Sequence, residues 1–395
     1  MKNIFLVTAS SLVGLLLGYI FFFTIYYINF ENKIKNTITS QEKFVVINKY
    51  NKILNHIRPE YSKYSELIFS TISAFKDSDN ILLQGDSWFM QINYPANDKA
   101  KSYKDVNIIH PTDNDLGSLK YIQEWSKSKN AGVINAGTGS YSPSLMSVQL
   151  EVLEKDFGIK PNILIAYIDQ TDLGDENCRY KNNIIYKNNK LTKVNATKTL
   201  TKQAFDYTRM LKISEINLSS NSKITKVFKI VNYELEFEFT KFFKKNYFKV
   251  SNILTGGWSN RKIKKCNVGE ILSYLGKANP NEINYFKSSL EEYLTRAKNK
   301  EYIKEIYLVS FPHLKNLKNI IEEEQNNYTN ISDIIDEVLE KKNNEFDQKF
   351  VHINFSEIIK NNKNLFGYKD YIFDNIHLKQ SQHKLFIKEI FSKVR

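Results

Sequence analysis

Short apolar runs separated by helical patterns are the feature that most restricts the fold of this sequence. Such runs are typical of parallel strands in a sheet that helices cover on both faces. Helical patterns lie between these runs, at residues 115–130, 142–158 and 281–300. A further helical pattern closes the chain at 381–394. The five runs lie at 80–84, 131–137, 161–168, 305–311 and 349–355. We therefore predict an α/β fold with a doubly wound, mainly parallel, five-stranded sheet.

A long segment interrupts this alternation between the third and fourth runs. Residues 178–278 contain amphipathic helical patterns, at 201–216 and 231–254. The segment is too long for an ordinary crossover connection. We predict a helical insert there. The insert would cover an active site, bind a partner or lie on a membrane. The sequence alone does not distinguish among these three roles.

The N-terminus carries an apolar stretch over residues 4–30 that has no charged side chain. About 20 apolar residues span a bilayer, whereas the apolar core of a signal peptide has only about 7–15. We predict that residues 1–30 form an uncleaved transmembrane signal anchor and that 31–78 form a helical stalk or linker. Residues 79–395 would then form a domain outside the membrane. The few lysines that flank the stretch do not determine its orientation.

Charge and cysteine content bear on the kind of partner. The net charge is +13, but lysine and asparagine are spread along the chain, so we expect no nucleic-acid partner. The two cysteines, Cys178 and Cys266, have neither a CxxC nor a metal-ligand spacing. We expect no metal and no other cofactor. A disulfide between the cysteines and two separate thiols stay open as alternatives, and so does the oligomeric state.

Residues suited to nucleophilic catalysis follow the predicted strands. Ser87 comes just after the first run, and Asp374-x-x-His377 follows the fifth. In doubly wound folds, ligands bind where the carboxyl ends of the strands meet. A serine hydroxyl needs a base to become a good nucleophile, and histidine held by a carboxylate is the usual base. The oxyanion needs preorganised donors, for which the backbone N–H groups of Ser87 and Gly139 are candidates.

These motifs resemble those of the SGNH (GDSL-like) hydrolase superfamily. "GDS" at 85–87 resembles its first block, "NAGTGS" at 135–140 its second, and "DNIH" at 374–377 its last. The resemblance covers about residues 79–177 and 300–395, in the order of the family's blocks.

Carried over residue by residue, the resemblance implies catalytic roles. Ser87 would be the nucleophile, His377 the base and Asp374 its carboxylate partner. Gly139 would be the second-block oxyanion donor, with Gly137 a weaker choice. The family's domain is flavodoxin-like, so the resemblance implies the same fold as the apolar runs.

The third block departs from the family pattern, which is Gly-x-Asn-Asp. The sequence places Asp169 at the family's glycine and Thr171 at its asparagine, while Asp172 matches. We expect the Thr171 hydroxyl to replace the asparagine amide as an oxyanion donor. Asp169 and Asp172 are possible supporting residues, and Arg179 is a possible cationic partner for Asp169.

We predict structural positions for two further histidines. His313 follows the fourth run and is expected to be a turn histidine, with a place in the cleft as the alternative. His383 lies on the last predicted helix and is expected at the surface.

The resemblance implies a serine esterase acting on ester-linked acyl groups. The anchor favours O-acetyl groups of a bacterial envelope glycan, with lipid esters as the next choice. The domain would lie on the periplasmic side of a bacterial inner membrane. An O-acyltransferase acting on a surface polysaccharide with the same triad is one alternative. A catalytically weak glycan-binding or assembly component of the envelope is another, because the third block is altered.

Overall fold

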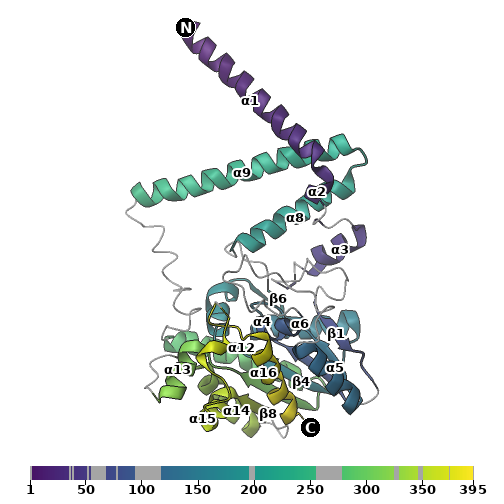
Figure 1. The fold of residues 1–395 in the computed structure, drawn as a ribbon, viewed down its shortest axis with the longest axis vertical. Helices are drawn as coiled ribbons and strands as arrows, with labels where there is room; N and C mark the ends of the chain where they lie inside the picture. The colour runs from purple at the N-terminus through teal and green to yellow at the C-terminus, as the bar shows by residue number, and fades with distance from the viewer. Residues whose placement is uncertain are drawn as a thin grey trace. The chain divides into compact units, whose positions relative to one another are not determined.

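The structure divides into two compact units, which are described separately. The smaller comprises Met1–Lys49 and Lys198–Lys265, and the larger Tyr50–Thr197 and Cys266–Arg395. The structure, a computed structural model, describes residues 2–34, 37, 40–50, 53–54, 68–76, 79–93, 117–194, 201–254, 278–323, 329–345, 350–372 and 374–394 (Figure 1).

A six-stranded sheet forms the centre of the described part of the larger unit. Its strand order is β1-β3-β2-β4-β7-β8, and every pairing is parallel except that of β1 with β3. The strands are β1 (Ser70–Ser73), β2 (Asn80–Gln84), β3 (Gly132–Asn135), β4 (Ile163–Tyr167), β7 (Glu305–Ser310) and β8 (Phe350–Asn354). The five predicted runs therefore form five adjacent parallel strands, which confirms the α/β fold with a mainly parallel sheet.

The predicted strand number is wrong by one, because β1 adds an antiparallel edge strand. β1 reads "STIS" and lies within the segment predicted as a helical stalk. A short edge strand faces solvent on one side and needs no continuous apolar run, so the run pattern missed it. Its register slips between Thr71 and Ser73, which is typical of a sheet edge.

Helices cover both faces of this sheet. One face packs on α4 (Ser87–Asn93), α5 (Ser118–Lys129), α13 (Leu314–Glu322), α15 (Phe355–Asn361) and α16 (Gln380–Lys393). The other carries α6 (Pro143–Phe157), α12 (Pro280–Lys298) and α14 (Ile331–Glu345), with α12 between the other two. Gln84 marks the second face: its amide bonds Gln149 of α6 at 2.8 Å, and Tyr293 of α12 donates to its oxygen at 2.9 Å.

The first part of the predicted helical insert, 178–278, contains a π-helical turn and a β-hairpin. β4 leads into α7 (Asp172–Gly174), a π-helical turn η3 (Asp175–Tyr180), and the hairpin of β5 (Ile184–Lys187) and β6 (Lys190–Val194). The hairpin turn is Asn188-Asn189, both with positive φ, which asparagine tolerates better than most residues. A last 3₁₀ turn, η4 (Tyr368–Asp370), precedes the loop that leads to α16.

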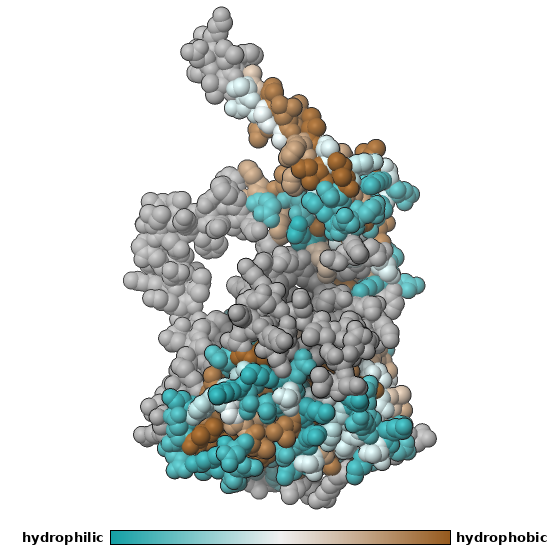
Figure 2. All heavy atoms as spheres, in the orientation of Figure 1, coloured by the Kyte–Doolittle hydropathy of each residue, from teal (hydrophilic) through white to brown (hydrophobic). Residues whose placement is uncertain are grey.

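The described part of the smaller unit is helical. It contains α1 (Lys2–Ile28), α2 (Phe30–Ile34), α8 (Thr201–Ser219) and α9 (Lys223–Leu254), with α3 (Gln41–Tyr50) at its boundary. Buried residues from α1, α2, α8 and α9 share one core, made of Tyr26, Phe30, Ile34, Ile213, Ile216, Val227, Ile230 and Val231. Within the described residues, Ala9–Ile28 of α1 is the one segment long and apolar enough to cross a membrane, a test that a signal sequence also passes. Figure 2 shows hydrophobic residues gathered along α1.

Candidate active site

Ser87 stands at the carboxyl end of the central strand β2, where the chain turns sharply into α4. Gly85 makes the turn with φ +151°, and a Cβ there would lie 2.9 Å from both Cβ and O of Tyr167. Only glycine fits such a close approach with that backbone angle. Trp88 follows, fully buried between Tyr167, Phe311 and Phe386, and anchors the start of α4.

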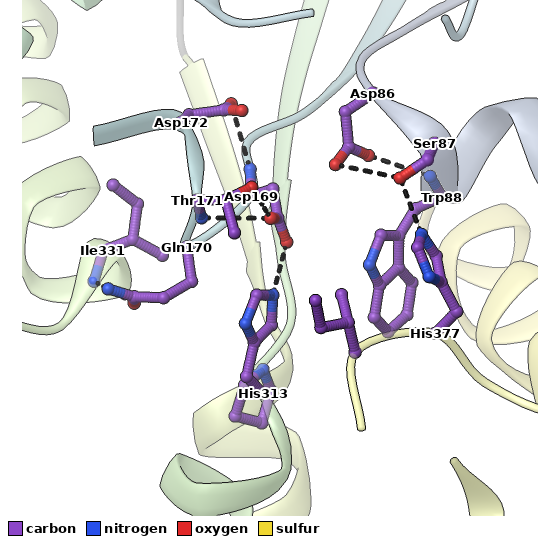
Figure 3. Close-up of polar contacts among 12 residues, drawn as sticks. Asp86, Ser87, Trp88, Asp169, Gln170, Thr171, Asp172, His313, Ile331 and His377 are labelled. Atoms are coloured by element: carbon purple, nitrogen blue, oxygen red, sulfur yellow. Dashed lines mark hydrogen bonds and ion pairs between the residues drawn. The ribbon is translucent and has the colours of Figure 1, made fainter. Parts of the chain in front are cut away.

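His377 reaches Ser87 from the loop before α16. Its Nε2 lies 2.6 Å from Ser87 Oγ, and its Nδ1 lies 2.6 Å from Asp374 Oδ2 (Figure 3 shows the Ser87–His377 contact). The other oxygen of Asp374 accepts the N–H groups of Ile376 and His377, at 2.9 and 3.0 Å. The structure thus brings Ser87, His377 and Asp374 into one chain of hydrogen bonds, across 290 positions of sequence.

The pKa of Asp374 indicates which His377 nitrogen carries a hydrogen in these hydrogen bonds. Burial opposes the charge of Asp374, but hydrogen bonds from the His377 ring and the backbone outweigh it and hold the pKa of the carboxyl below its usual value. An ionised Asp374 only accepts, so Nδ1 of His377 carries the hydrogen. In the neutral ring with that hydrogen on Nδ1, Nε2 is the acceptor for the Ser87 hydroxyl, as a general base requires.

The loop between β3 and α6 brings Gly137 and Gly139 to the same edge. Gly137 packs closely, since a Cβ there would lie 2.4 Å from Cβ of Phe89, and its N–H donates to Asn135. Gly139 is open, with no heavy atom within 4 Å of a Cβ built there. The loop is tied to the Ser87 turn by the Thr138 N–H, which donates to the Gly85 carbonyl at 2.9 Å.

Ser140, the next residue of this loop, has φ +61° and is held from outside. Arg179 Nη1 donates to its hydroxyl at 2.8 Å, and the Tyr180 hydroxyl donates to its carbonyl at 2.6 Å. Arg179 also pairs with Asp175 at 3.1 Å. The prediction that Arg179 is the cationic partner of Asp169 is therefore wrong.

His313 is the partner of Asp169. Its Nε2 lies 2.7 Å from Asp169 Oδ1, and both side chains are buried (Figure 3). β4 and β7 are adjacent parallel strands, so their carboxyl ends bring residues 169 and 313 together. The two positions predicted for His313, in a turn or in the cleft, did not include this pairing with Asp169.

Thr171 turns toward Asp169. Its hydroxyl and its N–H both donate to Asp169 Oδ2, the N–H at 3.0 Å. The hydroxyl hydrogen is used in that bond and is not directed at an oxyanion in this structure. Burial opposes the charge of Asp169, yet His313 and Thr171 outweigh it and lower the carboxyl pKa well below its ordinary value.

The other carboxyls of this edge behave in the opposite way. Burial, reinforced by neighbouring acids, raises the pKa of Asp86 and of Asp172 well above the usual value, and burial raises that of Asp175 to about 7. Asp172 accepts the Asp169 N–H at 3.1 Å and so supports the turn after β4. Asp169 is thus ionised at neutral pH, whereas Asp86 and Asp172 favour the protonated form and Asp175 titrates near neutral pH.

His383, expected at the surface, is buried. Its ring bridges the Ser118 hydroxyl at 2.6 Å and the Trp88 carbonyl at 2.8 Å. Burial lowers its pKa to about 4, so the ring is neutral. His383 thus holds the backbone at Trp88, one residue beyond Ser87. The helical periodicity of 381–394 did not predict that His383 faces inward.

Within the described residues, no group of three or more His, Cys, Asp or Glu side chains is arranged to hold a metal ion. Cys178 is disulfide-bonded, and Cys266 lies outside the described residues.

Comparisons with known proteins give distant structural matches. No protein-family model matches the chain, and no curated protein matches it in sequence. An acetyl-xylooligosaccharide esterase from Geobacillus stearothermophilus is similar at 11% identity and TM-score 0.37, over 82% of this chain and 95% of that one. An acetyl xylan esterase from Butyrivibrio proteoclasticus matches at 13% and TM-score 0.37, over 80% and 63%. An α/β hydrolase from the metagenome of Lake Arreo, Spain, matches at 9% and TM-score 0.36, over 82% and 97%.

Proposed function

We propose that this chain is a membrane-anchored serine esterase of the SGNH type. The observation that supports this most is the hydrogen-bond chain from Ser87 Oγ through His377 to Asp374, with both links at 2.6 Å. A nucleophile, a base and a carboxylate that orients the base are the groups that acyl transfer through a serine requires.

In the proposed reaction, His377 Nε2 takes the Ser87 proton while Oγ bonds to the ester carbonyl carbon. The tetrahedral intermediate collapses by breaking the bond to the alcohol oxygen, and His377 returns the proton to the leaving alcohol. Water then attacks the acyl-enzyme with the same base, which releases the carboxylic acid and restores the Ser87 hydroxyl. Asp374 keeps its negative charge throughout and stabilises the imidazolium.

The backbone supplies the oxyanion donors in this proposal. They are the N–H of Ser87 and that of Gly139, on the open stretch of the loop after β3. Thr171 is left out, because its hydroxyl donates to Asp169. The proposed site thus has two backbone donors and lacks the side-chain amide of the family pattern.

The proposed substrate is an O-acetylated envelope glycan, met outside the cytoplasm. α1 would be the anchor. The disulfide at Cys178 supports an oxidising compartment, since such bonds persist in the periplasm and rarely in the cytosol. An acceptor hydroxyl of a polysaccharide in place of water would make the same site an O-acyltransferase.

Hydrolysis of a chromogenic acetate ester by the detergent-solubilised full chain tests the proposal. Ser87→Ala and His377→Ala should each lower kcat/KM by at least about 10³-fold. Ser128→Ala, an exposed serine of α5, is the matched control and should leave the rate unchanged. Equal hydrolysis by all four proteins would remove Ser87 and His377 from the reaction.

One observation favours a second function, a slow or inactive glycan-binding component. Losing one oxyanion donor typically costs about 10²–10³ in rate, and the Thr171 hydroxyl is committed to Asp169. Binding of an acetylated glycan by wild-type protein, without release of acetate over many hours, would favour this function. Release of acetate that depends on Ser87 would exclude it.

A further inference from the structure

Helix α9 carries a stripe of large apolar side chains that the smaller unit does not bury. Ile224, Phe228, Leu235 and Phe239 are between 39 and 66% exposed. At about 100° per residue, these four positions fall within roughly 60° of the helix circumference. The four side chains therefore point to the same side of α9.

The stripe is distinct from the face of α9 that holds the unit together. Val227, Ile230 and Val231 are buried, and they pack with Tyr26 and Phe30 from the end of α1 and from α2. These buried positions lie beside the stripe on the helix. α9 thus has two apolar faces, and only one is needed for folding.

The stripe adjoins the apolar helix α1. The Tyr19 hydroxyl donates to Asn232 at 3.0 Å, and the Tyr19 ring meets Phe228 edge-on, with centroids 6.5 Å apart. Tyr19 lies inside the segment Ala9–Ile28 that is apolar enough to cross a membrane. A bilayer that takes up α1 would therefore reach the Phe228 ring as well.

We propose that α9 lies in the interfacial layer of a lipid bilayer, with the Ile224–Phe228–Leu235–Phe239 stripe inserted. The proposal rests on the retention of α1 in the membrane, which is part of the proposed function. α1 presents exposed apolar residues of its own, including Leu12, Leu16, Phe21 and Ile28. Lipid would cover both surfaces at once.

Charge and composition favour lipid over a protein partner. The α9 sequence has seven lysines and three glutamates, as expected for a helix that lies among anionic headgroups. An apolar stripe with aromatic residues, on a basic helix joined to an apolar one, fits an in-plane amphipathic helix.

The test places a fluorophore at matched neighbours on α9 of the full-length chain. Single cysteines replace Phe228 and Phe239 on the stripe, and Lys229 and Thr240, which are exposed and point elsewhere. Leu16→Cys on α1 reports the anchor. Each protein carries an environment-sensitive dye and is reconstituted in vesicles of phosphatidylcholine and phosphatidylglycerol. Quenching is measured with nitroxide-bearing lipid and, separately, with aqueous iodide, and unsubstituted protein gives the labelling background.

We expect dyes at 228 and 239 to emit at shorter wavelength, to lose fluorescence to nitroxide lipid and to be shielded from iodide. Dyes at 229 and 240 should show the reverse. If 228 and 239 match 229 and 240 while the dye at 16 is quenched by lipid, the anchor stands and the α9 proposal fails. Shielding of 228 and 239 from both quenchers would indicate a protein cover, such as a second copy, and would also overturn it. If the dye at 16 is not quenched by lipid, the anchor fails and α9 with it.

Discussion

Two histidine–carboxylate pairs lie at the same edge of the sheet, and they differ in what surrounds them. His377 is 2.6 Å from Asp374, has a side chain 15% exposed, and reaches Ser87. His313 is 2.7 Å from Asp169, and the exposed fractions of the two side chains are 0 and 1%. The first pair has the Ser87 hydroxyl beside it and access to solvent, whereas the second holds a buried charge beside Thr171. Similar distances therefore support different roles, chemical for the first pair and structural for the second.

The largest expected difference between the pairs is in activity. His377→Ala should lower kcat/KM by at least about 10³-fold with little change in the free energy of unfolding, because the ring is at the rim of the core. His313→Leu should retain most of the kcat of its folded fraction. Ester hydrolysis normalised to folded protein checks this, and a loss at His313 as large as that at His377 would break the distinction.

The next effect is in stability and is expected for the second pair. His313→Leu leaves the Asp169 charge buried without its partner, which should lower the free energy of unfolding by about 3–5 kcal/mol. Adding Asp169→Asn should restore part of the loss, because the uncompensated charge is gone. Urea unfolding of both single variants and the double variant gives the coupling, and strictly additive effects would contradict it.

His383 provides a third histidine, which is buried against the Ser118 hydroxyl and the Trp88 carbonyl, and its effect depends on pH. Its pKa is about 4 in the folded protein, below the ordinary value, so between pH 6.5 and 4 the unfolded chain binds a proton that the native ring does not. Stability should therefore fall as the pH drops through this window, by up to about 3 kcal/mol from this group.

The matched variant for that pH effect is His383→Gln, which keeps a donor for the Trp88 carbonyl. Its free energy of unfolding should fall less steeply between pH 6.5 and 4 than that of the wild type. Parallel pH profiles for the two proteins would show that His383 does not titrate in this way.

The smallest effect separates the two possible roles of Thr171. Thr171→Val removes a hydrogen bond to a charged group, which should cost about 1.5–3 kcal/mol of stability. Because the hydroxyl donates to Asp169, kcat should change by only a few-fold. A drop in kcat of about 10²–10³, with stability preserved, would instead identify Thr171 as an oxyanion donor.

Parts of this picture follow from local sequence, and others depend on pairings that sequence does not display. The apolar runs predict the five parallel strands, because burial on both faces demands continuous apolar residues. The places of Ser87 and His377 follow from where those runs end. β1 was missed, since its "STIS" sequence carries no apolar run.

The contact between Asp169 and His313 could not be predicted from local sequence. Asp169 and His313 lie 144 positions apart, so their contact depends on β4 and β7 being neighbours in the sheet. Arg179, named from the sequence as a possible partner of Asp169, pairs with Asp175 one helical turn away. His383 likewise faces inward because the start of α4 offers it a carbonyl to bind.

The most direct test of the central claim is the rate at which a fluorophosphonate modifies the full-length protein. Intact mass and peptide mapping would follow wild type and His377→Ala in parallel. If the His377–Asp374 pair activates Ser87, wild type gains a single adduct on Ser87 and the variant gains it at least about 10³-fold more slowly. No adduct on Ser87, or equal rates in the two proteins, would contradict the account.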